Sequence, residues 1–219
     1  MNRPRIILNC AISADGKLAL PDRTQLRISS DEDMKRVFEL RNSCDAVLVG
    51  SGAVLADDPK LTVKEKYVKH PRNPIRVVLD THLKTPVNAL VVNTDAPTIL
   101  FVGNDIKKNN HYTHSVEIIQ CQIDKDGLID LDAMLEILYK KGVQSILVEG
   151  GGTVLWNFLS KKLFDELYVY IGPMIIGGSG TPTLADGNGV STDNEIIRLR
   201  IASTKRLGEG LLITYKLRL

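Results

Sequence analysis

The sequence predicts an α/β protein whose mostly parallel central sheet ends in an antiparallel hairpin. Apolar runs of strand length recur along the chain, and several are continuous rather than alternating, as in strands covered on both faces. Helix signals lie in the gaps between these runs. Two further runs near the C-terminus are separated only by LGEG, a spacing typical of a hairpin. The expected strands are residues 5–11, 46–49, 75–79, 98–102, 116–120, 145–149 and 167–171, followed by the hairpin of residues 198–206 and 211–218.

Two of the expected helices have recognisable ends. Ser30 is expected to cap a helix that runs to about Asn42, because three acidic residues follow it in the first turn and complement the helix dipole. Asp130 is expected to cap a second helix over residues 131–141, and Gly142 to end it. The intervening helices complete the alternation of strand and helix.

Length and charge bound the architecture and the partners. A chain of 219 residues that is 43% hydrophobic can bury one large core, so we expect a single domain over residues 1–219. Lys and Arg total 28 against 26 Asp and Glu, and no long basic run supplies the electrostatics of nucleic-acid binding. No run approaches the roughly 18 apolar residues of a membrane span. We therefore expect neither a nucleic-acid nor a membrane partner.

The cysteines and histidines indicate no disulfide framework and no metal centre. Cys10, Cys44 and Cys121 are odd in number and widely separated, which is typical of reduced thiols and places the protein in the cytoplasm. His111 and His114 lie in a polar stretch with no nearby acid or thiol to complete a zinc site, so we expect them at the surface.

The segment ILVEGGGTVLWN, residues 146–157, predicts a phosphate-binding turn between a strand and a helix. Gly150, Gly151 and Gly152 lack a Cβ, so a phosphate can approach the backbone, and the free N–H groups of the helix start favour an anion. A P-loop is excluded because GK[ST] is absent. A tight strand-to-helix turn without a ligand explains the segment equally well.

Glu149 ends the strand immediately before these glycines. At the carboxyl end of a strand it can face the crevice in which α/β sheets bind ligands, and accept a hydrogen bond from a sugar hydroxyl or a ring amine. An exposed acid that caps the adjacent helix is the alternative.

A second segment, residues 50–64, GSGAVLADDPKLTVK, also follows an apolar strand and opens with glycines. Asp57 and Asp58 precede Pro59 and are expected in an extended or turn conformation, because the residue before proline is steered away from helix. One carboxylate can then face a ligand while its neighbour faces the backbone or water. On this segment alone, a plain Asp-Pro turn is the better interpretation.

Two cations and one glycine-rich stretch complete the candidate sites. Lys17, in SADGKLAL, follows the first strand and can serve as a phosphate-binding cation or a proton donor, although loop lysines are usually solvated. Arg41 precedes the second strand and can bind a phosphate or complement the negative end of its helix. Residues 175–184, IIGGSGTPTL, read as a long turn or an anion-binding nest.

The order of these segments resembles one known family. SADGKLAL, LRNSCDAVLVGSGAVLADDPKLTVK, NPIRVVLD, ILVEGGGTVLWNFL and VYIGPMIIGGSGTPTL are closely similar to the riboflavin-biosynthesis pyrimidine reductases, from about Ile6 to Leu217. The resemblance implies a dihydrofolate-reductase-like three-layer fold and a homodimer. Many bacterial members add a zinc deaminase domain with HxE and PCxxC motifs. This sequence has neither motif and looks like the stand-alone archaeal type.

The same resemblance implies the reaction. NADPH would reduce the ribosylamino side chain of 2,5-diamino-6-(5-phospho-D-ribosylamino)pyrimidin-4(3H)-one to the ribitylamino form. The furanose must open to an imine, C1′ must accept a hydride, and the departing ring oxygen must be protonated. No residue that would bind the 2′-phosphate is evident, so NADPH rather than NADH rests on the resemblance.

The resemblance also assigns residues to the site. The expected cofactor-binding residues are Ala53, Asp57, Thr81, Gly150, Gly151, Gly152, Thr153 and Val154, of which those from Gly150 onward would hold the pyrophosphate. The expected substrate-binding residues are Lys17, Arg41, Leu61, Lys64 and Glu149, with Lys17 and Glu149 also catalytic. Ala53 replaces a common threonine and loses a hydroxyl, and Lys64 replaces a common arginine and loses its two-point phosphate geometry.

Three alternatives stay open from the sequence. The same reduction can act on the deaminated 5-amino-6-(5-phosphoribosylamino)uracil. A related enzyme of the same fold can act on a pterin, although the DDPKLT and EGGG segments favour the riboflavin group. A non-catalytic NADPH-binding protein can keep the fold without turnover.

Overall fold

The structure is a computed structural model that describes residues 3–24, 26–107 and 111–218. The chain divides into two compact units. The first combines the N-terminal residues up to Arg5 with Phe38–Leu147, and the second combines Ile6–Val37 with the chain from Val148 onward. The single domain expected over residues 1–219 stays a prediction.

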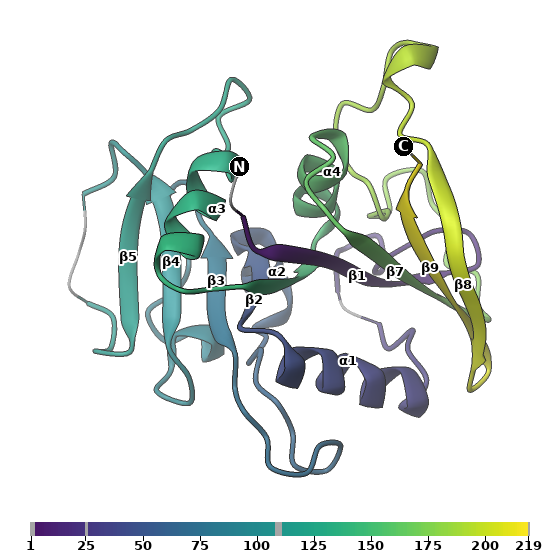
Figure 1. Ribbon diagram of the computed structural model, residues 1–219, viewed down its shortest axis with the longest axis horizontal. Helices are drawn as coiled ribbons and strands as arrows, with labels where there is room; N and C mark the ends of the chain where they lie inside the picture. The colour runs from purple at the N-terminus through teal and green to yellow at the C-terminus, as the bar shows by residue number, and fades with distance from the viewer. Residues whose placement is uncertain (1–2, 25, 108–110, 219) are drawn as a thin grey trace. The chain divides into compact units, whose positions relative to one another are not determined.

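The first unit is built on parallel strands. β2 (Ala46–Gly50), β3 (Ile75–Leu79), β4 (Thr98–Gly103) and β5 (Val116–Cys121) lie in this sequence, each parallel to the next (Figure 1). Every residue of β2 and β4 is buried. The continuous apolar runs are therefore confirmed as strands of a parallel sheet covered on both faces.

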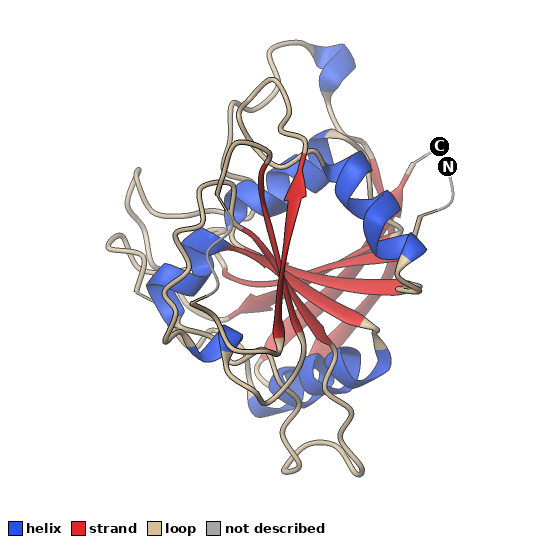
Figure 2. Cartoon of the chain, turned by 90° about the vertical axis from the view of Figure 1, so that its left-hand side faces the viewer, coloured by secondary structure: helices blue, strands red, loops and turns tan. Residues whose placement is uncertain are grey.

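Two helices and a 3-10 turn belong to the first unit, and Figure 2 shows helices in blue and strands in red. α3 (Leu131–Lys140) begins at Asp130, whose carboxylate accepts a hydrogen bond from Ala133 N at 2.8 Å, so the predicted cap is confirmed. α2 (Ser51–Asp57) was not expected from the sequence, because no side chain caps it and its N-cap is Gly50. η1 (Leu90–Val92) is a single 3-10 turn.

Two elements carry the chain across the boundary between the units. α1 (Asp31–Ser43) begins in the second unit and ends in the first. Ser30 Oγ accepts a hydrogen bond from Asp33 N at 3.2 Å, which confirms the predicted cap. β6 (Ser145–Gly150) also crosses, with Leu147 as its last residue in the first unit.

The second unit combines parallel and antiparallel pairing. β1 (Arg5–Ser13) is parallel to β7 (Glu166–Gly172). β9 (Gly210–Leu217) pairs antiparallel with β7 and also with β8 (Leu199–Leu207), which confirms the C-terminal hairpin. α4 (Gly152–Ser160) and the 3-10 turn η2 (Asp193–Glu195) complete the unit.

The core of the first unit fixes the position of the segment after β2. Its apolar cluster comprises Val47, Val49, Val54, Leu61, Val78, Ala89, Val91, Val92 and Leu100. Val54 anchors α2 and Leu61 anchors the chain beyond it, so the sequence from 51 to 61 is packed on the sheet rather than left as a surface loop. Burial of this kind contributes roughly 1.5–3 kcal/mol for each large aliphatic side chain.

Within the described residues, no helix combines the length and the apolar character needed to cross a membrane.

Candidate active site

Three of the expected cofactor-binding residues gather at the carboxyl ends of strands in the first unit. Gly50, the last residue of β2, lies opposite Leu79 of β3 in the parallel ladder. α2 starts directly after Gly50 and carries Ala53 and Asp57, while Thr81 follows β3. The carboxyl edge of a parallel sheet is where α/β proteins bind ligands, so this unit brings Ala53, Asp57 and Thr81 to a suitable edge.

Asp57 lies in a helix, in contrast to the expected extended or turn conformation, and its carboxylate is a candidate ligand contact. It is the last residue of α2, not extended, because the restriction imposed by Pro59 falls on Asp58 alone, whose φ and ψ are 40° and 58°. Asp57 Oδ1 is buried and has no hydrogen-bond partner among the described residues. Burial raises the pKa of this carboxyl. A buried, unpaired carboxylate oxygen is costly, and a ligand hydroxyl would satisfy it.

The two cations expected to bind phosphate contact the same aromatic ring. The Arg41 guanidinium carbon lies 5.2 Å from the centre of the Phe38 ring, and Lys64 Nζ lies 5.5 Å from it. Phe38 in turn stacks on Tyr67, with the ring centres 4.8 Å apart. Arg41 Nη1 also donates to Thr62 O at 3.2 Å, two residues before Lys64 in the chain. The structure therefore brings Arg41 and Lys64 together, and two neighbouring cations suit a doubly charged phosphate.

Leu61 lies between Asp57 and Lys64 in the sequence, and its side chain is turned away from solvent. The side chain is only 2% exposed and belongs to the apolar cluster beneath α2. Its φ of 53° is in the left-handed region. Any contact of Leu61 with a substrate would therefore come from its backbone.

The three glycines of the second unit have three different environments. Gly150 has a φ of 103°, which side-chain residues rarely adopt. A Cβ on Gly152 would contact Thr183 O and would lie 2.7 Å from Asp186 Oδ2. Gly151 has an ordinary φ of −64°, and a Cβ built on it meets no atom of the described residues within 4 Å. The fold itself requires glycine at 150 and 152 but not at 151.

The turn that carries Lys17 is fixed to the same loop that packs on Gly152. Lys17 N donates to Ser13 Oγ at 2.9 Å, and Lys17 forms an isolated β-bridge with Thr183. The second unit thus brings Lys17 and the start of α4 to one loop. Among the described residues, the Lys17 ammonium has no hydrogen-bond or ion-pair partner, which leaves its protons for a ligand.

The glycine-rich loop after β7 contains an anion-binding nest that the protein fills itself. Asp15 accepts hydrogen bonds from Ile176 N at 3.1 Å and Gly177 N at 2.7 Å. The Ser13 hydroxyl donates to the same carboxylate at 2.6 Å. These bonds, led by that from Ser13, lower the pKa of Asp15 to about 2. The N–H groups of residues 176 and 177 are therefore occupied by Asp15, which ties the Lys17 turn to the loop.

Glu149, Thr153 and Val154 flank the glycines. Glu149 is half-buried at the carboxyl end of β6, as expected, and Gly150 ends the strand. Thr153 is exposed and Val154 half-buried in the first turn of α4. The helix N-cap is Gly151, and no side chain of the described residues caps the N–H groups there, so they can bind an anion.

The structure shows two residues, Asp186 and Arg76, that support the site and that the sequence did not single out. Asp186, 34 residues beyond Gly152, leaves no room for a Cβ at that glycine, and nothing local in the sequence points to it. Arg76 is completely buried in β3. The sequence signal that could have identified Arg76 is an arginine inside an otherwise apolar strand. A buried charge needs a hydrogen-bond partner for each of its polar groups, so such a residue indicates a polar network.

Within the described ranges, no group of three or more His, Cys, Asp or Glu side chains is placed to hold a metal ion. His111 and His114 are exposed, as expected. Cys10, Cys44 and Cys121 are buried, free cysteines.

Relatives of known name match the chain along its length. The family model described as the RibD C-terminal domain matches residues 4–213. The chain is 38% identical to the 2,5-diamino-6-ribosylamino-4(3H)-pyrimidinone 5′-phosphate reductase of Archaeoglobus fulgidus, over 97% of each chain. It is also 38% identical to the reductase of the same name from Methanothermobacter thermautotrophicus, over 97% of this chain and 98% of the relative.

Solved structures share the fold. The chain matches a diaminohydroxyphosphoribosylaminopyrimidine deaminase/5-amino-6-(5-phosphoribosylamino)uracil reductase of Thermotoga maritima with a TM-score of 0.79 and 27% identity, over 99% of this chain and 57% of that chain. A dihydrofolate reductase of Enterococcus faecalis matches with a TM-score of 0.52 and 12% identity, over 98% of this chain and 97% of the other, which shows the fold alone. The predicted dihydrofolate-reductase-like fold class and the sequence resemblance are confirmed, and the chain belongs to the RibD C-terminal domain family.

Proposed function

We propose that this protein reduces the ribosylamino side chain of 2,5-diamino-6-(5-phospho-D-ribosylamino)pyrimidin-4(3H)-one to the ribitylamino form, with NADPH, in riboflavin biosynthesis. The names of the two archaeal relatives, at 38% identity over nearly the whole chain, support this substrate and reaction class. The structural observation that carries the proposal is Gly151, a glycine that the fold does not need, at the N-cap of a helix with free backbone donors.

Each unit carries residues that suit one part of a nicotinamide dinucleotide. In the second unit, the backbone N–H groups from Gly150 to Val154 would bind the pyrophosphate, because a helix start favours an anion and Gly151 lets it approach. In the first unit, the unpaired Asp57 oxygen would accept a hydrogen bond from a ribose hydroxyl, with Ala53 and Thr81 beside the nicotinamide half. When bound, NADPH supplies the hydride.

The phosphorylated pyrimidine would be held by its charge and its sugar. Arg41 and Lys64 would bind the 5′-phosphate, Arg41 through its planar fork and Lys64 as a point charge. The backbone of Leu61 would line the same site. Glu149 would accept a hydrogen bond from the substrate at the end of β6.

The chemical step needs a proton where the sugar ring opens. As the C1′–O bond breaks, the nitrogen lone pair forms a protonated imine and the ring oxygen takes up a proton to become a hydroxyl. C1′ of the protonated imine then accepts the hydride, which gives the neutral amine. Lys17 would hold or donate that proton, because its ammonium has no partner among the described residues and its turn is fixed by Ser13 and Thr183. Glu149 would orient the opening sugar.

We also propose that the enzyme is cytoplasmic and a homodimer. Every residue of β8 from 200 to 206 is exposed. These include the apolar Ile201, which is 60% exposed. Leu211 on the neighbouring β9 is also exposed. A long exposed outer strand is a site where a second chain can pair or pack. Light scattering on the purified protein tests this, and a monomer at micromolar concentration contradicts it.

The activity is tested by following NADPH oxidation with the two candidate pyrimidines in parallel, and with NADH in place of NADPH. The proposal expects turnover of the diamino substrate with NADPH. Higher kcat/KM on the deaminated uracil would assign the second substrate, the one named for the Thermotoga maritima relative. Tight NADPH binding without turnover of either pyrimidine would indicate a non-catalytic protein.

A further inference from the structure

Arg76 sits at the centre of a polar network in the first unit. Its side chain is completely buried, and its five N–H groups have five acceptors. Nε donates to Thr98 Oγ1 at 2.9 Å, and Nη1 donates to Leu90 O at 3.2 Å and to Asn93 Oδ1 at 2.8 Å. Nη2 donates to Asn93 O at 2.6 Å and to Ala96 O. Burial lowers the pKa of Arg76 to about 10, so the guanidinium keeps its charge at neutral pH.

All five acceptors belong to one stretch of chain, from η1 to the start of β4. Arg76 therefore fixes the backbone of residues 90–98 to the strand beside it. Asn93 and Asp95 add a local turn, in which Asp95 N donates to Asn93 Oδ1 at 3.0 Å. Residues 90–98 thus form a loop that is held in place by the buried Arg76 side chain, all of whose N–H groups are hydrogen-bonded.

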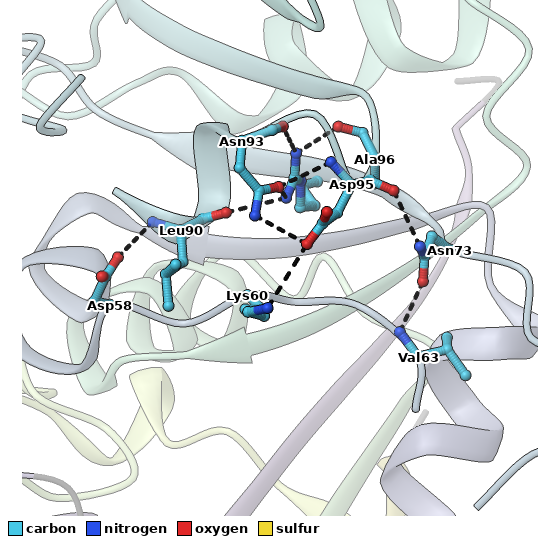
Figure 3. Close-up of polar contacts among 9 residues, drawn as sticks. Asp58, Lys60, Val63, Asn73, Leu90, Asn93, Asp95 and Ala96 are labelled. Carbon is cyan, nitrogen blue, oxygen red and sulfur yellow. Dashed lines mark hydrogen bonds and ion pairs between the residues drawn. The ribbon is translucent and has the colours of Figure 1, made fainter. Parts of the chain in front are cut away.

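This loop in turn holds residues 58–63 (Figure 3). Asp58 Oδ1 accepts from Leu90 N at 2.7 Å. At the other end of the segment, Asn73 Oδ1 accepts from Val63 N at 2.9 Å while Asn73 Nδ2 donates to Asp95 O at 3.1 Å. An exposed ion pair between Lys60 and Asp95, 3.8 Å apart, adds little.

The segment depends on such anchors because its backbone is not relaxed. Asp58 and Leu61 have φ values of 40° and 53°, a region that residues with side chains occupy only when tertiary contacts support it. Asp57, with its unpaired oxygen, lies immediately before the segment, and Lys64, on the Phe38 ring, lies immediately after it.

We infer that Asp58 and Asn73 are positioning residues, which transmit the fixed geometry of the Arg76 loop to the cofactor side and the phosphate side of the site, respectively. This inference rests on the proposed function. Asp58 sets the direction of Asp57 as α2 ends, and Asn73 sets the backbone from which Lys64 extends. Neither side chain needs to touch a ligand.

The two positions predict different kinetic effects. Asp58→Ala removes the acceptor of Leu90 N and should raise the KM for NADPH about tenfold, with the KM for the pyrimidine little changed. Asn73→Ala should do the reverse, raising the KM for the phosphorylated pyrimidine about tenfold. Asp58→Asn keeps an oxygen that can accept from Leu90 N and should restore the NADPH KM to within about twofold of wild type.

Asp130→Ala is the matched control, because it also removes a carboxylate that accepts a backbone N–H in the first unit, at the N-cap of α3. It should lower Tm without changing either KM. If Asp58→Ala and Asn73→Ala also lower Tm with both KM values unchanged, the positioning inference is overturned while the proposed function stands.

If the wild-type protein shows no turnover, the effect of the Asp58 variants is measured as a change in the NADPH dissociation constant. A tenfold weakening in Asp58→Ala that Asp58→Asn reverses would still support the inference for Asp58. A wild-type protein that neither binds NADPH nor turns over would overturn the proposed function and this inference with it.

Discussion

The three glycines after Glu149 can be separated by experiment, because a methyl group at each has a different consequence. At Gly151 the added Cβ meets no atom within 4 Å, and the backbone angles of −64° and −167° suit alanine. Gly151→Ala should therefore leave stability unchanged or raise it by about 0.4–1 kcal/mol, through the lost freedom of the unfolded chain.

Cofactor binding should respond in the opposite direction. A methyl group at the N-cap of α4 keeps a pyrophosphate from the backbone N–H groups, and each lost hydrogen bond to a charged group is worth roughly 1.5–3 kcal/mol. Gly151→Ala should therefore weaken NADPH binding by about tenfold or more, since 1.4 kcal/mol corresponds to a factor of ten.

Gly152→Ala is the contrasting variant. Its Cβ would collide with Thr183 O and lie 2.7 Å from Asp186 Oδ2, so the fold must shift. Overpacking of this kind costs roughly 1–3 kcal/mol, which lowers Tm by about 2–12 °C in a protein of this size. Calorimetric titration with NADPH and thermal unfolding distinguish the two variants. A Gly151→Ala protein with wild-type NADPH affinity would refute the assignment of these glycines to the cofactor.

Three further predictions concern charged residues. Lys17→Met should lower kcat by about a hundredfold, in the range of a lost general acid, while the NADPH dissociation constant stays the same; unchanged turnover in stopped-flow assays removes Lys17 from the chemistry. Arg41→Ala should raise the KM for the pyrimidine by about tenfold or more, because the phosphate contact is lost. Arg41→Lys should give an intermediate KM, since lysine keeps the charge but not the planar fork. An unaltered KM in Arg41→Ala refutes the phosphate role. The pKa of Asp15 is lowered from 3.8 to about 2, so its carboxylate contributes stability above the unfolded value that is lost as pH falls from about 4 to about 2. The stability difference between wild type and Asp15→Asn, from urea unfolding, should shrink over that range, and a constant difference argues against the filled nest.

Local signals in the sequence predicted the elements whose causes are local. The caps at Ser30 and Asp130 need only a side chain and a backbone N–H three residues ahead, and both hydrogen bonds are present. The continuous runs at β2 and β4 predicted buried parallel strands for the same reason. Strand ends were displaced by one or two residues, as at β1, which continues to Ser13.

Features that depend on distant partners were not predictable from one stretch of sequence. α2 was missed because Gly50 caps it without a side chain, and its stability comes from Val54 packing on the sheet. The expectation that Asp57 is in an extended or turn conformation was wrong for a related reason, because the helix α2 includes Asp57 as its last residue. The expectation that one carboxylate of the pair faces the backbone is confirmed, since Asp58 accepts from Leu90 N.

The candidate site shows the same division. The residue types that suit a phosphate, a ribose and a proton transfer could be named from the sequence, as could the chain order that identifies the family. The arrangement of Arg41 and Lys64 around Phe38 could not, because it depends on the path of residues 58–63 and on the buried Arg76 that supports it.

The central claim is that this protein transfers a hydride to C1′ of the substrate's sugar. Incubation of the diamino pyrimidine 5′-phosphate with NADPH that carries deuterium at both C4 positions of the nicotinamide, followed by mass spectrometry and NMR of the product, tests it most directly. The proposed function predicts a ribitylamino product with one deuterium at C1′. Recovery of unreduced substrate, or of a product deuterated elsewhere, would contradict it.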